Sequence, residues 1–239
     1  MAEIKHVLIL ANSIRAQKRC IAGKELIPNG EGGYYFGPWI RFTDPSVQDG
    51  AVSDQSTICP GHGFIKVFDI VKIIFRGKCN NPDHPEDWWF EPDQKWEFVG
   101  RGDVAWFPQL VDSPASLWHE GMDNDAVQSG FVRHMGANAA TLFLIKAPAQ
   151  WNFNYRKEWN SFTHKYDKRR RLSFDYAGKH HIFSVTDPSF TARHRVYENM
   201  TDQNQTVTVA NPAGAYFCLS LTPEFNGKHY KIGATIFEP

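Results

Sequence analysis

Thr43-Asp44-Pro45-Ser46, the sequence TDPS, recurs in the second half of the chain as Thr186-Asp187-Pro188-Ser189. Each copy follows a short apolar stretch rich in β-forming residues, Trp39–Phe42 in the first half and His181–Val185 in the second. Asp-Pro is a turn signal, so each copy marks a point where a strand ends. The repeat therefore points to two related β-domains in one chain, and the alternative is a chance match of four residues.

The composition agrees with a β-rich protein. A chain of 239 residues is long enough for one large domain or two of about 110 residues each. Aromatic residues make up 14% of the sequence, which suits pleated sheets and surfaces that stack on flat ligands. The formal net charge is zero, so no overall field attracts nucleic acid or a membrane. A site for a polyanion must then be a local basic patch.

The four cysteines, Cys20, Cys59, Cys79 and Cys218, form no CxxC motif and are typical of the reduced thiols of a cytosolic protein. The N-terminal apolar run is far shorter than the core of a signal peptide. The longest apolar segment, Phe64–Phe75, contains three charged residues and is too short to cross a bilayer. We expect a cytoplasmic protein without membrane contact.

Phe64–Phe75 is rich in β-branched residues, so we predict a strand there. This strand places Asp69 on a mostly apolar face, and a buried carboxylate needs a partner. An ion pair with an arginine at the edge of the core is favoured over a functional role. Further along, Gly121–Gly136 is mostly polar and is our predicted linker.

The second half shows hairpin patterns. Arg171–Tyr176 and His181–Thr186 flank a Gly-containing turn, and Ala215–Thr222 and Lys228–Phe237 flank the turn PEFNG. Short strands follow one another without intervening helical segments. This rhythm predicts all-β barrels or sandwiches.

Several stretches together resemble the bacterial dual OB domain family. They are HVLILANSIRAQKRCIAGKEL (His6–Leu26), GPWIRFTD (Gly37–Asp44), FIKVFDIVKIIF (Phe64–Phe75), HPEDWWF (His84–Phe90), FDYAGKHHIFSVTDP (Phe174–Pro188) and CLSLTPEFNGKHYKIGATIF (Cys218–Phe237). Two positions depart from the family pattern. Phe42 stands where proline is usual, and His84-Pro85-Glu86-Asp87 replaces a Gln-Pro-Glu-Asn form.

The resemblance implies an all-β fold of two OB-like β-barrels in tandem, with short helices and long loops. We place the first barrel at residues 1–125 and the second at 136–239. The resemblance also implies a bacterial origin and an association with nucleic acid or with antiviral defence systems. It supplies no catalytic residues.

A basic run, HKYDKRRRL, is the first candidate site. OB-like surfaces bind single strands by stacking bases on aromatic rings while cations contact the phosphates. The alternative is a solvated loop neutralised by Glu158 and Asp167. The predicted nucleic-acid contacts are Lys165, Lys168, Arg169, Arg170 and Arg171, with the upstream rings Trp151, Tyr155 and Trp159.

Arg19, Trp39 and Arg41 form a second candidate, because the resemblance places them in one barrel where they would frame a groove. Guanidinium groups bind phosphate and stack on bases. The alternative is an arginine packed over a tryptophan for structural reasons.

A third candidate is a metal site. Cys59-x2-His62 and Cys79-x4-His84 have local spacings that suit zinc, which would hold a domain closed. Chance spacing is the alternative, and we expect no other cofactor. Pro82-Asp83 and Asp93-Gln94-Lys95 imitate a nuclease pattern, but prolines interrupt the strands that such a site requires.

The leading hypothesis is a non-enzymatic binding module for single-stranded nucleic acid or a nucleotide-like ligand. Family analogy makes it an accessory or sensor subunit of a bacterial defence system. The first alternative is a protein–protein scaffold within a larger complex. The second is a metal-dependent hydrolase that uses Asp69, His84, Glu86 and Asp87.

Overall fold

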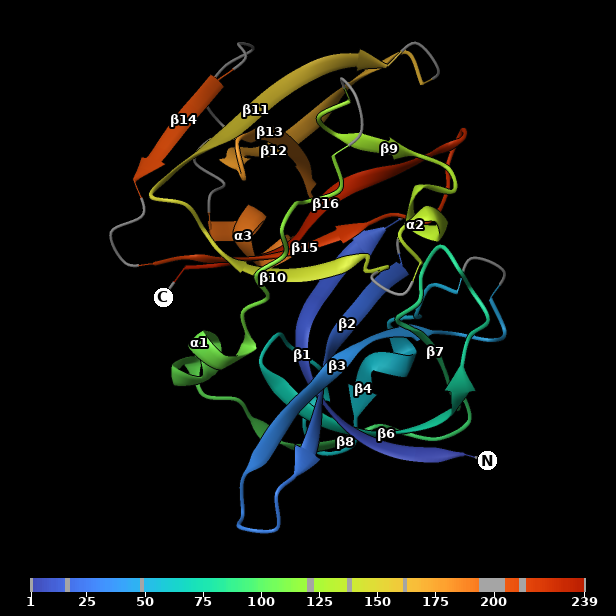
Figure 1. The fold of residues 1–239 in the computed structure, drawn as a ribbon. Helices are drawn as coiled ribbons and strands as arrows, with labels where there is room; N and C mark the ends of the chain where they lie inside the picture. The colour runs from blue at the N-terminus through green and yellow to red at the C-terminus, as the bar shows by residue number, and fades with distance from the viewer. Residues whose placement is uncertain are drawn as a thin grey trace. The chain divides into compact units, whose positions relative to one another are not determined.

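The computed structural model describes residues 2–15, 18–47, 50–119, 123–136, 139–160, 163–193, 205–210 and 214–238. The chain forms two compact units (Figure 1). Unit 1 comprises Met1–Val111 and Gly130–Leu142, and unit 2 comprises Asp112–Ser129 and Phe143–Pro239. The described helices are short and none could span a membrane. The predicted all-β fold is confirmed.

Unit 1 contains a closed barrel. Its main sheet has the order β1-β2-β3-β7-β6-β8, and β1 also pairs with β6, which closes five strands into a ring. All neighbours are antiparallel except β3 and β7, which run parallel. The elements are β1 (Glu3–Arg15), β2 (Lys18–Pro28), β3 (Tyr34–Thr43), η1 (Gln55–Thr57), β4 (Ile58–Cys59), β5 (Gly63–Phe64), β6 (Asp69–Lys78), β7 (Asp87–Phe90), β8 (Glu97–Arg101), η2 (Val104–Trp106), α1 (Phe107–Leu110) and α2 (Phe131–His134).

Unit 2 repeats this topology. Its sheet has the order β10-β15-β16-β13-β12-β11-β14, and β13 and β16 are the parallel pair. Only residues 147–149 separate β10 from β11, so we count these two strands as one bent first strand. With this count, the order from β10 to β11 contains five strands and returns to the first one, and β14 pairs with β11 outside this set. The elements are β9 (Ala126–Gln128), β10 (Leu142–Lys146), β11 (Gln150–Asn160), β12 (Lys165–Tyr176), β13 (Lys179–Val185), α3 (Pro188–Arg193), β14 (Gln205–Ala210), β15 (Tyr216–Leu221) and β16 (Lys228–Phe237).

The two TDPS motifs occupy equivalent places, each directly after the third strand of its barrel. Asp44 and Asp187 are both buried, at 5% and 3% exposure. In each, Oδ1 accepts a hydrogen bond from the backbone N–H two residues later, Ser46 at 2.9 Å and Ser189 at 2.8 Å. This side-chain turn ends the strand in both units. The inference of two related β-domains from the repeat therefore holds in three dimensions.

Alternation along the strands builds each core. In unit 1, Val71, Ile73 and Phe75 of β6 point inward with the other members of a buried cluster that includes Phe42 and Trp96. The Phe42 ring meets the Phe75 and Trp96 rings edge-on, at centroid distances of 5.3 Å and 5.2 Å. Unit 2 builds its interior in the same way from Trp151, Phe153, Phe174, Phe183, Phe190 and Phe217.

Two predictions about segments need correction. The strand predicted at Phe64–Phe75 begins only at Asp69, because Phe68 adopts a left-handed backbone conformation, with φ of 70°, that interrupts an extended chain. The predicted linker at residues 121–136 contains β9, which pairs with β16 in unit 2. It also contains α2, which belongs to unit 1. Between residues 112 and 142 the chain passes from unit 1 to unit 2 and back to unit 1, near the boundary that we expected at residues 125–136.

Asp69 confirms the expectation of an ion pair. Its carboxylate is fully buried and accepts a hydrogen bond from Arg101 Nη1 at 2.7 Å. His62 Nε2 lies 2.9 Å from the other carboxylate oxygen, which also accepts from the Lys66 backbone N–H. The buried charge is thus held by several donors, as its desolvation requires.

A candidate nucleic-acid interface on the β11–β12 ribbon

Strands β11 and β12 extend past their neighbours as a two-stranded ribbon (Figure 1). They pair with each other from Asn152–Ser173 to Asn160–Lys165. In the described part of the chain, β14 accompanies β11 only as far as Tyr155, and β13 accompanies β12 only from Arg171 onward. We use the term ribbon for the described residues 156–160 and 163–170.

Backbone register divides the ribbon into two faces. Directly opposed residues of an antiparallel pair lie on the same face. Trp159 lies opposite Tyr166, and Arg170 lies opposite Tyr155, whose side chain points into the barrel. The inner face of the ribbon therefore carries Trp159, Tyr166, Lys168 and Arg170. The outer face carries Arg156, Lys165, Asp167 and Arg169, and Arg171 continues it toward the barrel.

The inner face combines exposed rings with cations. Trp159 is 56% exposed and Tyr166 is 66% exposed. Their ring centroids are 5.2 Å apart and the planes meet at 69°, so the two rings support each other without covering their outward faces. Lys168 is exposed and Arg170 is half-buried. None of the paired positions on this face, 155, 157, 159, 166, 168 and 170, is Asp or Glu.

The outer face carries two ion pairs. Arg169 forms an ion pair with Asp167 at 3.3 Å. Arg171 reaches Asp125, with Nη1 3.1 Å from Oδ2. Lys165, at the end of the ribbon, is exposed. The predicted basic run is thus divided by strand alternation into an inner face without acidic residues and an outer face with ion pairs.

Two of the predicted stacking residues belong to the core. Trp151 and Tyr155 are each 2% exposed, because they alternate with Asn152 and Asn154 along β11 and point inward. The Trp151 ring meets the Phe217 ring edge-on at 5.3 Å. Neither ring can stack on a base in this arrangement.

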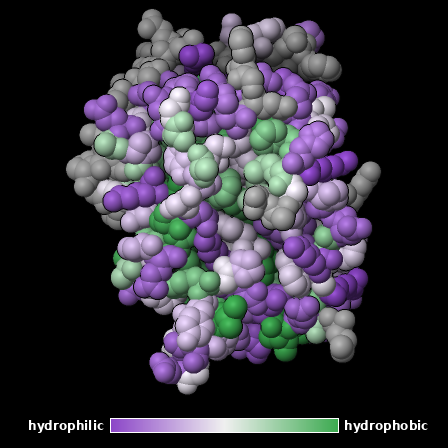
Figure 2. All heavy atoms as spheres, viewed as in Figure 1, coloured by the Kyte–Doolittle hydropathy of each residue, from purple (hydrophilic) through white to green (hydrophobic). Residues whose placement is uncertain are grey.

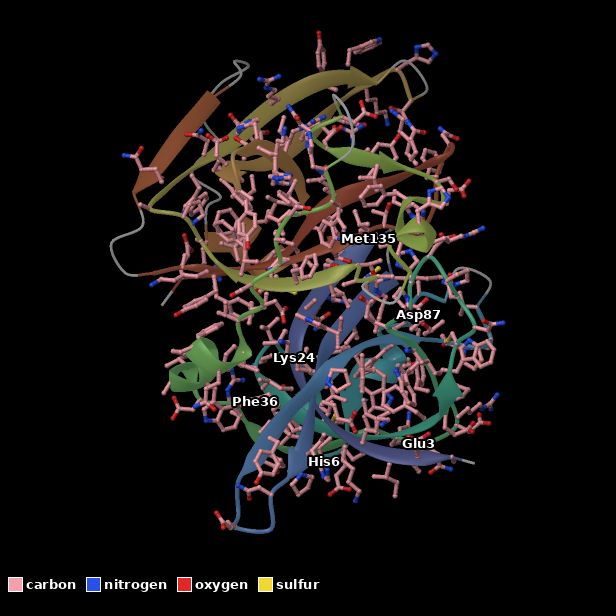
Figure 3. The ribbon with its side chains drawn as sticks, viewed as in Figure 1. Glu3, His6, Lys24, Phe36, Asp87 and Met135 are labelled. Atoms are coloured by element: carbon pink, nitrogen blue, oxygen red, sulfur yellow. The ribbon has the colours of Figure 1, made fainter. Side chains whose placement is uncertain are left out.

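Unit 1 holds the second predicted set, whose members make separate contacts within this unit. Arg19 Nε lies 2.6 Å from Asp54 Oδ1 at the surface. Trp39 packs under Lys24, whose Nζ lies 5.5 Å from the ring centroid and donates to the Leu110 carbonyl at 2.7 Å. Lys24 is labelled in Figure 3 and is only 8% exposed. On the face of β2 and β3, which OB barrels use for ligands, Lys24 is therefore already bonded to the chain of unit 1 itself.

Arg41 takes part in a buried polar network with the β6–β7 loop. Its Nη2 donates to Thr141 Oγ1 at 2.9 Å, and its Nη1 contacts His84 Nδ1. Thr141 in turn donates to the Glu86 carboxylate from its backbone N–H at 2.6 Å and its hydroxyl at 2.8 Å. Asp87, labelled in Figure 3, lies 3.6 Å from Arg41. These contacts fix the loop against β3 and the 139–142 segment.

Burial raises the pKa of Asp87 to about 6. Arg41 and the hydrogen bond from Asn81 lower the pKa again in part, and the Glu86 charge raises it further. The three acidic residues Asp83, Glu86 and Asp87 are all less than 10% exposed. Arg133 neutralises Asp83 with two hydrogen bonds, one of them 2.7 Å long. Protonation of Asp87 near pH 6 and below removes one negative charge from this network.

The residues predicted to bind zinc have separate surroundings. Cys59 is fully buried in the barrel core, and burial together with Asp69 raises its pKa to about 11. His62 binds Asp69 and stacks on Phe98 at 3.7 Å. Burial and the Asp87 charge raise the pKa of Cys79 to about 11. His84 lies in the Arg41 network. Among the described residues, no group of three or more His, Cys, Asp and Glu side chains is arranged to hold a metal ion.

The residues of the hydrolase hypothesis are only partly brought together. His84, Glu86 and Asp87 share the Arg41 network, whereas Asp69 belongs to the His62–Arg101 group on β6. All four cysteines lie in the described part of the chain, and none forms a disulfide bond.

The sequence model of the dual OB-containing domain matches residues 5–236. The chain belongs to the dual OB-containing domain family. Comparison with curated proteins finds no match. For this family member, the two barrels with a parallel third and fifth strand are therefore the OB domains that the sequence predicted.

Tyr166 is the inner-face residue that the sequence reasoning missed. Our predicted strand began only at Arg171, so the basic run before it had no strand periodicity by which alternate residues could be separated. The period of two in Tyr166, Lys168, Arg170 and Leu172 is visible in the sequence and leads from an aromatic residue to a core residue. Reading the run as a strand would have selected these four side chains.

Proposed function

We propose that unit 2 binds single-stranded nucleic acid through the inner face of the β11–β12 ribbon. The observation that supports this most directly is the exposed Trp159–Tyr166 pair, which shares one face with Lys168 and Arg170. Aromatic rings stack on unpaired bases of any sequence, and neighbouring cations contact the phosphates. OB domains commonly bind nucleic acids in this way, so the family supports the proposal.

The test is the affinity for a labelled single strand of about 16 nucleotides, the upper end of the site size of an OB fold. Stacking contributes about 1–3 kcal/mol per base, so Trp159→Ala should weaken binding about 5- to 150-fold, and Tyr166→Ala should act in the same range. Lys168→Ala combined with Arg170→Ala should reduce the slope of log affinity against log salt by about 1.4.

The outer face provides the matched control. Arg169→Ala combined with Arg171→Ala removes the same amount of charge from the opposite face of the ribbon, away from the two rings. We expect a smaller change in the salt slope. Equal effects of the two double variants, or unchanged affinity after loss of both rings, would show that the inner face is not the binding site. A duplex that binds as well as the single strand would also contradict the stacking model.

A nucleotide-like ligand is the closest variant of this proposal. One base engages one ring and few phosphates, so binding of a mononucleotide would show a shallow salt slope and depend on one of the two aromatic residues. Competition between a mononucleotide and the labelled strand distinguishes the two cases.

A protein–protein scaffold is the alternative. Unit 1 exposes apolar side chains, among them Ile4, Tyr35 and Val104, each at least 62% exposed. In the view of Figure 2, hydrophobic residues form small separate areas among hydrophilic ones, whereas scaffold interfaces require larger continuous patches. A pull-down that returns one stoichiometric protein without nucleic acid would favour the scaffold.

For the biological setting, we infer an accessory or sensor subunit of a bacterial antiviral defence system, located in the cytoplasm and acting without catalysis. The resemblance to the family supports the setting.

A further inference from the structure

The inner face of the ribbon has a closed end. Along β12 this face runs from Tyr166 through Lys168 to Arg170, and its next position is Leu172. Lys168 is exposed and Arg170 is half-buried, whereas Leu172 is fully buried and its register partner Phe153 is 3% exposed. The face that is open to solvent on the ribbon therefore becomes the interior of the barrel directly beyond Arg170.

Side chains fill the barrel interior beyond Arg170. Tyr155, which lies opposite Arg170, is 2% exposed. Phe190 of α3 is 1% exposed and packs edge-on against Phe153, with ring centroids 5.2 Å apart. A nucleic acid that follows the inner face toward the barrel thus meets a packed core. Its chain must either end there or leave the face.

The open part of the inner face is short. Each residue of a strand adds about 3.4 Å, so Tyr166 and Arg170 are separated by about 14 Å along β12. A stacked single strand rises about 3.4 Å per nucleotide, so this length holds about four nucleotides. The rings of Trp159 and Tyr166 lie at the open end, and Lys168 and Arg170 lie toward the closed end.

The charges favour a terminal phosphate at the closed end. An internal phosphate of a nucleic acid carries one negative charge, whereas a phosphate monoester carries about 1.5 to 2 at pH 7 and has three acceptor oxygens. Lys157 occupies the register position opposite Lys168, Arg170 follows on the same face, and none of the paired positions of this face is acidic. Cations attract a doubly charged group more strongly than a singly charged one.

We propose that the inner face of the ribbon binds the phosphorylated end of a single strand. The terminal phosphate contacts Lys168 and Arg170, and the adjacent bases stack on Trp159 and Tyr166. This inference rests on the proposed function, because it concerns the same face and the same rings. It adds that the ligand has a free end that carries a phosphate. The closed end accommodates a 5′- or a 3′-phosphate, and the experiment distinguishes these two sources.

The test compares four forms of one single strand of about 16 nucleotides. They carry a 5′-phosphate, a 3′-phosphate or hydroxyl groups at both ends, or are closed into a circle. An internal fluorescent label leaves the ends unmodified, and anisotropy at one salt concentration gives the affinities for the full chain. We expect one phosphorylated strand to bind about 10- to 150-fold more tightly than the hydroxyl form, the range of a charge-assisted hydrogen bond. The circle should bind more weakly than every linear form.

The outcomes separate this inference from the proposed function. If the phosphorylated strands bind no better than the hydroxyl strand, or the circle binds as well as the linear strands, recognition of a phosphorylated end is overturned. The proposed function then still holds, because stacking on unpaired bases requires no chain end. If none of the four forms binds, both are overturned.

Two lysines of the β12–β13 hairpin give a matched pair of variants. Lys168→Ala should reduce the preference for the phosphorylated over the hydroxyl strand about tenfold. Lys179→Ala removes an exposed lysine next to the turn at the other end of β12 and should leave this preference unchanged. Lys168 is exposed, so we expect its variant to fold like the native chain. Equal preferences in the two variants would refute the placement of the phosphate at the closed end.

Discussion

The carboxyl group of Asp87 should make the stability of this protein fall as the pH rises from about 4 to 7. Burial raises its pKa from 3.8 to about 6 in the folded chain. The group therefore binds a proton more tightly when folded, so its contribution to stability is complete below pH 4 and is lost as the pH passes through 6. The difference of about 2.2 pKa units corresponds to about 3 kcal/mol of the free energy of unfolding.

The assay compares native chain with Asp87→Asn by urea unfolding at several pH values between 4 and 7.5. The free energy of unfolding of the variant minus that of the native chain should increase with pH by about 3 kcal/mol, because asparagine cannot ionise. Subtraction removes the contributions of groups that the two proteins share. Asp87 is 6% exposed, so solvent screens little of this effect.

Glu97→Gln is the control with the opposite sign. Glu97 is exposed, and its hydrogen bond and ion pair with Lys72 lower its pKa. Its variant should lose a small amount of stability relative to the native chain as the pH rises. A difference for Asp87→Asn that is flat with pH, or that decreases, would show that the network around Arg41 stabilises the ionised carboxylate and would refute the burial argument.

Two further substitutions test the fold by urea unfolding. Gly23→Ala places a Cβ atom 2.0 Å from the Leu8 carbonyl oxygen on β1, so it should lower the free energy of unfolding by about 1–3 kcal/mol or more. The control is Gly100→Ala, whose Cβ atom would have nothing within 4 Å and should lower this free energy by less than about 1 kcal/mol. Equal losses would contradict the close approach of β1 and β2. Asp187→Ala leaves the backbone N–H groups of Ser189, Phe190 and Ile236 without their acceptor, and each buried donor left unpaired costs about 1–3 kcal/mol. This variant should therefore lose more stability than Asp44→Ala. A larger loss in Asp44→Ala would contradict the capping role of Asp187.

Sequence reasoning was most successful where local chemistry decides the structure. The turn after each TDPS motif depends on a side chain and a backbone N–H two residues apart, so it is encoded within four residues. The ion pair of Asp69 followed from the cost of a buried charge, although the identity of Arg101 as partner did not. The ends of strands were harder, because the left-handed conformation of Phe68 is unusual for a bulky residue and has no sequence signal.

The candidate sites were less predictable because they depend on which face of a strand is covered. Trp151 and Tyr155 carry the alternation of a core strand, and the composition of the region as a whole concealed it. Arg41 is bonded to Thr141, one hundred residues later in the chain, and no local pattern reports such a contact. A residue type that suits a ligand is therefore informative only once its face is known.

The two OB barrels show in one molecule how a candidate binding face depends on what covers it. In unit 1, Lys24 and Arg41 lie on the second and third strands, the face that OB barrels use for ligands, but Leu110 and Thr141 of the same unit accept their hydrogen bonds. A competing phosphate would have to break these buried contacts, each worth about 1.5–3 kcal/mol when one partner is charged. In unit 2, the first and second strands instead extend beyond the sheet, where Trp159 of β11 and Tyr166 of β12 are exposed. The exposed rings offer a nucleic acid a stacking surface, which is why we propose binding by unit 2 rather than by the arginine-rich face of unit 1.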